Sequence, residues 1–127
     1  MNPQFIISVK PKGEVEVLFY MTIGKVLFKC KGLDNVPAAR ALIRKIKRNC
    51  KPAKMPYCEI EDDHFFQILD RSGKTLCRSR SYTSKHRTRD GMRIALSQIP
   101  EAAVKLQKAD DGYSDEEDDD DDDLAAE

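Results

Sequence analysis

Two stretches of the chain carry the same order of sequence patterns, 49 residues apart. At this offset Gly24-Lys25-Val26-Leu27 aligns with Gly73-Lys74-Thr75-Leu76, and Ile43 aligns with Met92. An internal repeat constrains the fold more than any single motif, because one unit buries little apolar surface alone and needs its partner to complete a core. We therefore predict two copies of one supersecondary unit.

The first unit is predicted to contain three strands and a helix. Residues 4–9 form a short apolar run, and residues 14–21 and 26–31 alternate between two kinds of side chain, which is the period of a half-buried strand. A helix is expected over 34–49, because the Asp34-Asn35 pair offers an N-cap and apolar residues then recur at helical spacing.

The second unit is predicted to repeat that order. Strands are expected near 57–62, 64–71 and 75–82, and a helix from Ser84 to about Ile99, capped by Ser84 or the threonine before it. Two prolines mark a linker between the units. The expected organisation is a first β-β-β-α repeat at 1–51, a linker at 52–56, a second β-β-β-α repeat at 57–108 and an acidic tail at 109–127.

The formal net charge of zero hides two oppositely charged parts of the chain. All 22 lysines and arginines lie within residues 10–108, which hold only 10 acidic residues and so carry a net charge of +12. Residues 109–127 hold the other 12 acidic residues and no base. We expect this tail to be disordered, because it has almost no apolar content. Its unbroken acidic run consists of Asp118, Asp119, Asp120, Asp121, Asp122 and Asp123.

A further pattern lies in the second unit, where residues 65–74 read FFQILDRSGK, residues 81–85 read SYTSK, and Gly91-Met92 follows. These residues resemble the repeats of the YegP-like proteins, which are small, mostly bacterial and of uncharacterised activity. The resemblance implies an α+β fold in which both repeats form one antiparallel sheet, with the two helices exchanged between repeats and packed on one face. It supplies no biochemical role, because one fold hosts many functions. The chain departs from the family pattern at His64, Asp70, Ser72 and Lys74.

A basic face is predicted on the sheet. If Phe28 and Cys77 face the helices, the cations that alternate with them point from the opposite face, beside Tyr20, Phe65 and Tyr82. Rings and positive charges on one face suit base stacking and phosphate neutralisation, as in single-strand binders. The alternative is that these cations only solvate an amphipathic fold. The candidate nucleic-acid-binding residues are Lys29, Lys31, Arg78, Arg80, Tyr82, Lys85, Arg87 and Arg89.

These features favour a non-enzymatic binding protein whose basic body contacts nucleic acid or another polyanion. The acidic tail could compete for that surface, capture a basic partner or keep a basic protein in solution, and the matched charges favour competition. The alternative is a protein–protein interaction module that binds and modulates a protein partner. Salt dependence separates the two, because phosphate binding weakens steeply as salt rises and a packed apolar interface does not.

Catalytic, metal and cofactor sites are not expected. The Asp62-Asp63-His64 stretch is interpreted as exposed turn residues, since neighbours at a strand junction point in different directions, and no nucleophile or phosphate-loop motif accompanies it. No apolar run is long enough to span a bilayer and no signal peptide is recognised, so a cytoplasmic protein without membrane contact is expected. The cysteines lack the paired spacing of a zinc site and are expected as free thiols, namely Cys30, Cys50, Cys58 and Cys77.

Overall fold

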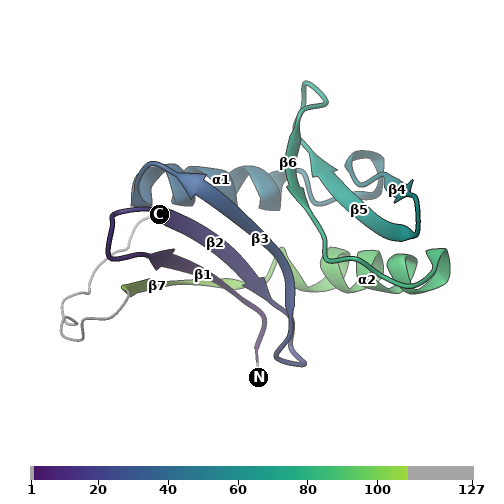
Figure 1. Cartoon of the computed structure of the whole chain (residues 1–127), viewed down its shortest axis with the longest axis horizontal. Helices are drawn as coiled ribbons and strands as arrows, with labels where there is room; N and C mark the ends of the chain where they lie inside the picture. Colours follow the sequence, from purple (N-terminus) through teal and green to yellow (C-terminus); the bar gives the residue numbers. More distant parts are fainter. Residues whose placement is uncertain (1, 109–127) are drawn as a thin grey trace.

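The computed structural model describes residues 2–108 and shows two β-β-β-α segments followed by a last strand (Figure 1). The strands are β1 (Gln4–Val9), β2 (Val15–Tyr20), β3 (Val26–Leu33), β4 (Tyr57–Ile60), β5 (Asp63–Leu69), β6 (Thr75–Arg78) and β7 (Ala103–Lys108). The helices are α1 (Val36–Arg48), the short 3-10 helix η1 (Pro52–Lys54) and α2 (Lys85–Gln98).

The first sheet has the strand order β3-β2-β1-β7. β1, β2 and β3 form an antiparallel meander, and β7 lies parallel to β1. The register places Phe5 opposite Phe19 and Phe19 opposite Phe28, so the three rings lie on one face. Their centroids are 4.9 to 6.1 Å apart and none is more than 2% exposed. This cluster forms the aromatic centre of the core.

The second sheet has the order β4-β5-β6 and meets the first where β6 passes β3. Phe28 and Ser79 form an isolated antiparallel bridge, and the Arg80 N–H donates to the Leu27 carbonyl over 2.7 Å. Ser79 also ties this point to β5, because its hydroxyl accepts from the Phe66 N–H at 3.0 Å. We call the junction of Leu27 and Phe28 with Ser79 and Arg80 the seam.

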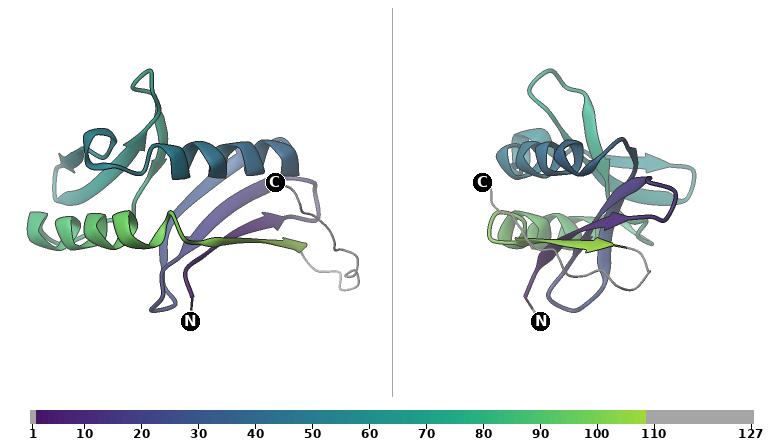
Figure 2. Two further views of the ribbon diagram at one scale, coloured as in Figure 1. Left: turned by 180° about the vertical axis from the view of Figure 1, so that it is seen from behind. Right: turned by 90° about the vertical axis from the view of Figure 1, so that its left-hand side faces the viewer.

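Each helix begins at a side-chain cap and buries a stripe of small or branched residues. The Asn35 side chain accepts from the Ala38 N–H at 2.8 Å, and the Ser84 hydroxyl accepts from the Arg87 N–H at 3.1 Å. α1 covers one face of the first sheet and α2 packs on β5 and β4. Figure 2 shows the two helices side by side, and the Cys50 thiol after α1 donates to the α2 carbonyl of Ala95 at 3.4 Å. The buried stripes are Ala39, Ile43 and Ile46 in α1 and Thr88, Gly91 and Ala95 in α2.

The α+β class is confirmed, and so are both helices, both caps and the six strands that the sequence patterns predict. The prediction of one antiparallel sheet is wrong in two respects. The strands divide into two sheets that meet at the seam, and the parallel strand β7 adds to the first. Two register irregularities between β2 and β3 accompany this division, and such irregularities increase local twist and turn a strand away from its neighbour.

The sequence analysis missed β7, although its signal is present. Val104 and Leu106 alternate with Lys105 and Gln107, which is the period of a strand. Leu106 packs against the core, and Lys105 pairs with Ile6. The sequence analysis includes these residues in the second repeat, because β7 is short and only four residues separate it from α2.

The exchange of helices implied by the family resemblance is not observed within residues 2–108. α1 packs mainly on β1 and β2 of its own segment and reaches β6, while α2 packs on β5 and β4 of its own segment. Each helix therefore packs chiefly on the sheet that precedes it in the chain.

Gly91 marks the closest approach between α2 and the chain that precedes it. A Cβ atom at this position would lie 2.3 Å from the Tyr82 hydroxyl oxygen and 2.7 Å from the ring carbon that carries it. The Tyr82 main chain is itself held, because its N–H donates to the His64 carbonyl at 2.7 Å. The ring can therefore lie against the helix only because residue 91 has no side chain.

We expect Gly91→Ala to destabilise the protein by about 1–3 kcal/mol, the usual cost of overpacking. In a Tyr82→Ala background the same change should stabilise it by about 0.8–1 kcal/mol, because alanine favours a helix over glycine. Urea unfolding of the four proteins measures both effects. If Gly91→Ala changed the free energy of unfolding in the same direction in both backgrounds, the contact between Tyr82 and Gly91 would be contradicted.

Candidate polyanion-binding surface

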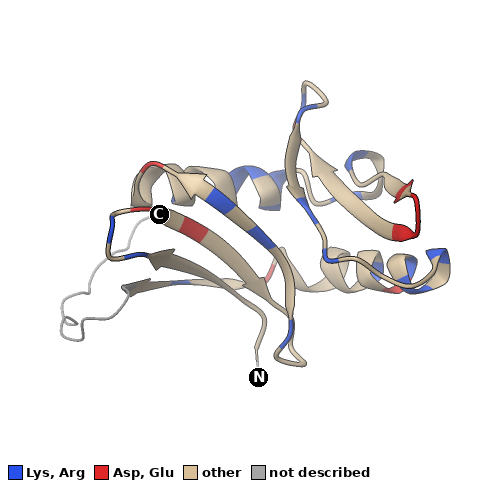
Figure 3. Cartoon of the chain, viewed as in Figure 1, with Lys and Arg blue, Asp and Glu red and all other residues tan. Residues whose placement is uncertain are grey.

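Three of the predicted cations meet beside the seam. Lys29 lies on β3, Arg78 at the end of β6 and Arg80 in the chain after β6. Together with Phe28 and Ser79 they line an open groove of about 330 Å³. Figure 3 shows the blue segments of β3 and of the β6 region facing each other across the junction. The groove exists because the seam brings two separate sheets together with their cation-bearing faces on the same side. We call it the seam groove.

Arg78 owes its position to an aromatic ring. Its guanidinium carbon lies 3.7 Å from the centroid of the Phe65 ring, and Phe65 is only 1% exposed. The expectation that Phe65 offers an open ring on the basic face is therefore wrong, because Arg78 covers it. Arg78 is itself exposed, so its N–H donors remain accessible to a phosphate.

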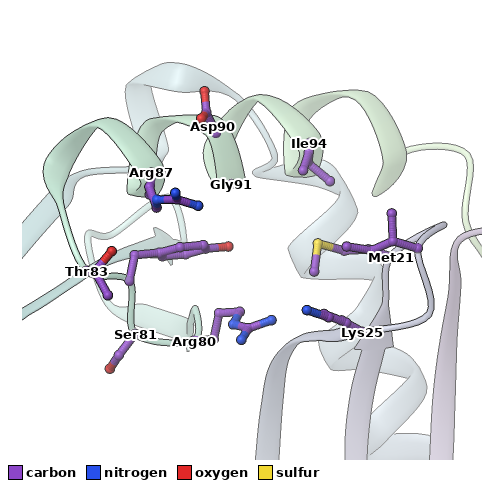
Figure 4. Close-up of a pocket in the computed structure, with 11 residues that line it drawn as sticks. Met21, Lys25, Arg80, Ser81, Thr83, Arg87, Asp90, Gly91 and Ile94 are labelled. Carbon is purple, nitrogen blue, oxygen red and sulfur yellow. The ribbon is translucent and has the colours of Figure 1, made fainter.

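A second hollow of about 560 Å³ adjoins the seam groove, and Arg80 lines both. It lies between the β2–β3 hairpin, the chain after β6, and α2. Figure 4 shows Lys25 from the hairpin, Arg80 from the chain after β6 and Arg87 from α2 directed into this space. We call it the hairpin pocket. Positive charge from three separate elements is thus concentrated at one opening.

The walls of the hairpin pocket combine apolar and aromatic side chains. Met21 and Ile94 line it with Tyr82, whose ring lies 5.9 Å from the Arg80 guanidinium carbon. Burial raises the pKa of the Tyr82 hydroxyl, and the nearby Arg80 partly opposes the rise. Tyr82 is half-buried against Gly91, so the prediction that it stands free on the basic face is wrong. It forms part of a pocket wall beside Arg80.

The hairpin that carries Lys25 is fixed to the last turn of α2. The Gln98 side chain accepts from the Thr22 N–H at 3.0 Å and donates to the Thr22 hydroxyl at 3.1 Å. Gly24 closes the turn with a φ of 87°, where its N–H donates to the Met21 carbonyl at 2.8 Å. These contacts hold one side of the pocket at a defined position relative to the helix.

One carboxylate lines the hairpin pocket, and it is already engaged. Asp90 pairs with Arg93 one turn along α2, and His86 lies 3.7 Å from its other oxygen. In Figure 4 Asp90 points away from the space into which Lys25 and Arg87 are directed. Within residues 2–108, no ion pair within 4.0 Å involves any cation of the seam groove or the hairpin pocket. Their charge is uncompensated by that part of the chain.

The structure divides the eight predicted residues into separate groups. Lys29, Arg78 and Arg80 line the seam groove, and Arg80, Tyr82 and Arg87 line the hairpin pocket. Lys31 is exposed further along β3. Lys85 lies on another side of α2, with its ammonium nitrogen 5.2 Å from the Tyr57 ring. Desolvation raises the pKa of the Tyr57 hydroxyl, and the nearby Arg89 partly opposes the rise. The six aspartates at 118–123 lie outside the described residues.

Lys25 is the pocket cation that the sequence analysis missed, and the apolar wall of Met21, Ile23 and Ile94 was not foreseen either. Lys25 sits in a turn, and the strand and helix periods that indicated the other cations carry no information about a turn. The internal repeat does single out this position, because the Gly24-Lys25 pair recurs as Gly73-Lys74 at the same offset of 49 residues.

The histidine that the sequence analysis considered has a structural partner. The Nδ1 atom of His64 lies 2.6 Å from the Tyr57 hydroxyl oxygen across the β4–β5 pair. Residues 2–108 contain no group of three or more histidines, cysteines or acids suited to a metal ion. Among the helices of those residues, none has the length and apolar character needed to cross a membrane.

The four cysteines are free thiols with different surroundings. Burial raises the pKa of Cys77, and its interaction with Cys30 raises it further while lowering the pKa of Cys30. Burial raises the pKa of Cys50 to about 11. Cys58 is half-buried on β4.

We expect thiol alkylation of the native protein to modify Cys58 before Cys50, and Cys77 only after unfolding. Thiolates are the reactive species, so a raised pKa and burial both slow the reaction. Mass spectrometry after timed treatment with iodoacetamide measures the order. In denaturant all four should react alike, and equal rates for Cys58 and Cys77 in the native protein would refute the expectation.

The fold defined by these two helices and two sheets is one that solved structures share. YegP from E. coli, a protein of unknown function, matches with a TM-score of 0.77 and 12% identity over 87% of this chain and 97% of its own. A UPF0339 protein from Shewanella oneidensis matches with a TM-score of 0.76 and 14% identity over 85% of this chain and 93% of its own. These likenesses confirm the resemblance to YegP-like proteins, and at such identities they establish the fold alone. No protein-family model and no curated protein matches the sequence.

Proposed function

We propose that the chain is a non-enzymatic binding protein whose basic body contacts nucleic acid or another polyanion, with the acidic tail competing for the same surface. The observation that carries this proposal is the seam groove. Lys29, Arg78 and Arg80 come from two different sheets to one opening, and no carboxylate of residues 2–108 pairs with them. A cytoplasmic location belongs to the same proposal.

The chemistry of the groove suits phosphates more than carboxylates on a protein. Two of the three cations are arginines, whose planar fork matches two phosphate oxygens at once. The groove continues through Arg80 into the hairpin pocket, which gives a linear ligand successive contacts. The surrounding net charge of +12 over residues 10–108 would raise the association rate of any polyanion.

The test of the seam groove compares two variants that lose the same charge. In Arg78→Met with Arg80→Met, methionine still covers Phe65 while both charges are lost. We expect weaker binding of a single-stranded oligonucleotide, and the slope of log affinity against log salt should fall by about 1.4. Fluorescence anisotropy across a salt series measures both quantities.

The matched control is Lys105→Met with Lys108→Met. β7 is three strands away from β3, so Lys105 lies about 14 Å from the seam groove. The control should lose much less affinity than the groove variant. Equal losses in the two variants would show that the body binds through diffuse charge rather than a localised surface.

Competition by the tail has its own test. Removing residues 109–127 should tighten oligonucleotide binding by at least about tenfold at low salt, because a tethered anion acts at millimolar effective concentration. The gain in affinity should shrink as salt rises, because salt screens the attraction of the basic body to the tail and to the oligonucleotide alike. A chain in which asparagine replaces the six aspartates at 118–123 should behave like the truncated one. Unchanged affinity in both would rule out competition.

A second candidate function is supported by one observation. Ile60 is 57% exposed on β4, which lies at the edge of the second sheet as described. An apolar side chain on an open edge suits docking of a protein partner by strand addition. Binding to a protein partner that persists at high salt and is lost in the Ile60→Lys variant would favour the interaction module over the polyanion binder.

We also propose that the two β-β-β-α segments are copies of one duplicated unit with their helices on a common side. The matching order of elements and the shared offset of 49 residues support it. The proposal has no bearing on which ligand binds.

A further inference from the structure

We infer that the hairpin pocket binds one nucleotide unit of a single-stranded nucleic acid, with its phosphate among Lys25, Arg80 and Arg87 and its base against the apolar wall. The inference rests on the proposed function and specifies the ligand of the surface. It assigns to the pocket a role distinct from that of the seam groove, which contacts the backbone only.

The three cations define where a phosphate would sit. They come from the hairpin, from the chain after β6 and from α2, and in Figure 4 their side chains are directed toward one space. An anion between them would interact favourably with all three charges. The hydrogen bonds of Gln98 to Thr22 fix the hairpin that carries Lys25, and the Tyr82 ring lies 5.9 Å from the Arg80 guanidinium carbon.

The apolar wall indicates that the ligand is more than an inorganic ion. Met21 and Ile94 line the same pocket, and Ile23 at its rim is 67% exposed, the largest exposure of any large apolar residue in the described part of the chain. A ligand that carries both a phosphate and a flat ring would cover this side chain. A nucleotide has this combination of groups.

The size and the connection of the pocket favour a single strand. Its volume of about 560 Å³ lies within the usual range for small-ligand sites. A base inside a duplex would have to leave its stack to enter, which costs free energy that a single strand does not lose. Because Arg80 lines both hollows, a strand in the seam groove can place one of its nucleotides in the pocket without a gap.

The first measurement is a titration of the full chain with adenosine 5′-monophosphate, adenosine and inorganic phosphate, followed by amide NMR shifts. We expect the monophosphate to bind most tightly and to shift amides of residues 21–25 and 80–94. If inorganic phosphate binds equally well, or if the shifts lie elsewhere, the inference is overturned.

The second measurement compares charge-matched variants. Lys25→Gln with Arg87→Gln should weaken binding of the monophosphate by at least about tenfold, since each loses a charge-assisted contact. Arg44→Gln with Lys45→Gln removes the same charge from exposed positions on α1, which line neither hollow, and should change it by less than about twofold. Equal effects would refute the pocket.

A single-stranded oligonucleotide and its duplex separate this inference from the proposed function. The pocket variant should reduce the preference for the single strand, while Arg78→Met with Arg80→Met should weaken both ligands. Oligonucleotide binding that is insensitive to the pocket variant would overturn the inference and leave the proposed function standing. Failure of the full and the truncated chain to bind any oligonucleotide would overturn both.

Discussion

The architecture depends on a backbone junction only a few residues long. The Phe28–Ser79 bridge and the hydrogen bond from Arg80 to Leu27 connect the two sheets. Both hollows lie beside this junction and share Arg80 as a wall. A longer ladder between β3 and β6 would have merged the sheets into one, so the short seam accounts for their division.

Cations gather on this surface with little local opposition. The acids of residues 2–108 that form ion pairs are Glu16, with Lys10, and Asp90, with Arg93 and His86. Neither partnership includes a residue of the seam groove. Most exposed cations of a small protein are solvated without a ligand, but here three of them also share walls with apolar side chains. A ligand with both an anionic group and an apolar group would find a partner for each of them here.

The periodicity of apolar residues and the N-cap residues predicted the helices and strands well, because both are local properties of the chain. Strand alternation correctly placed Lys29 and Arg78 on exposed positions and Phe28 and Cys77 inside. It failed for Phe65, since alternation assigns a side to a residue but cannot show that Arg78 covers the ring. It also could not reveal the hairpin pocket, whose residues are joined by three-dimensional packing between a turn, a connection and a helix. The division into two sheets depends on twist, which leaves no simple mark on the sequence.

The parallel pairing of β7 with β1 has a consequence for how the chain folds. β1 finds its outer neighbour only when residues 103–108 have been made, because Gln4 pairs opposite Ala103 and Val9 opposite Lys108. Until then one edge of the meander stays open, with its hydrogen-bonding groups unsatisfied. Contacts between such distant parts of a chain slow folding. β1 therefore remains an edge strand while synthesis proceeds from residue 9 to residue 108, and an open edge can pair with another chain.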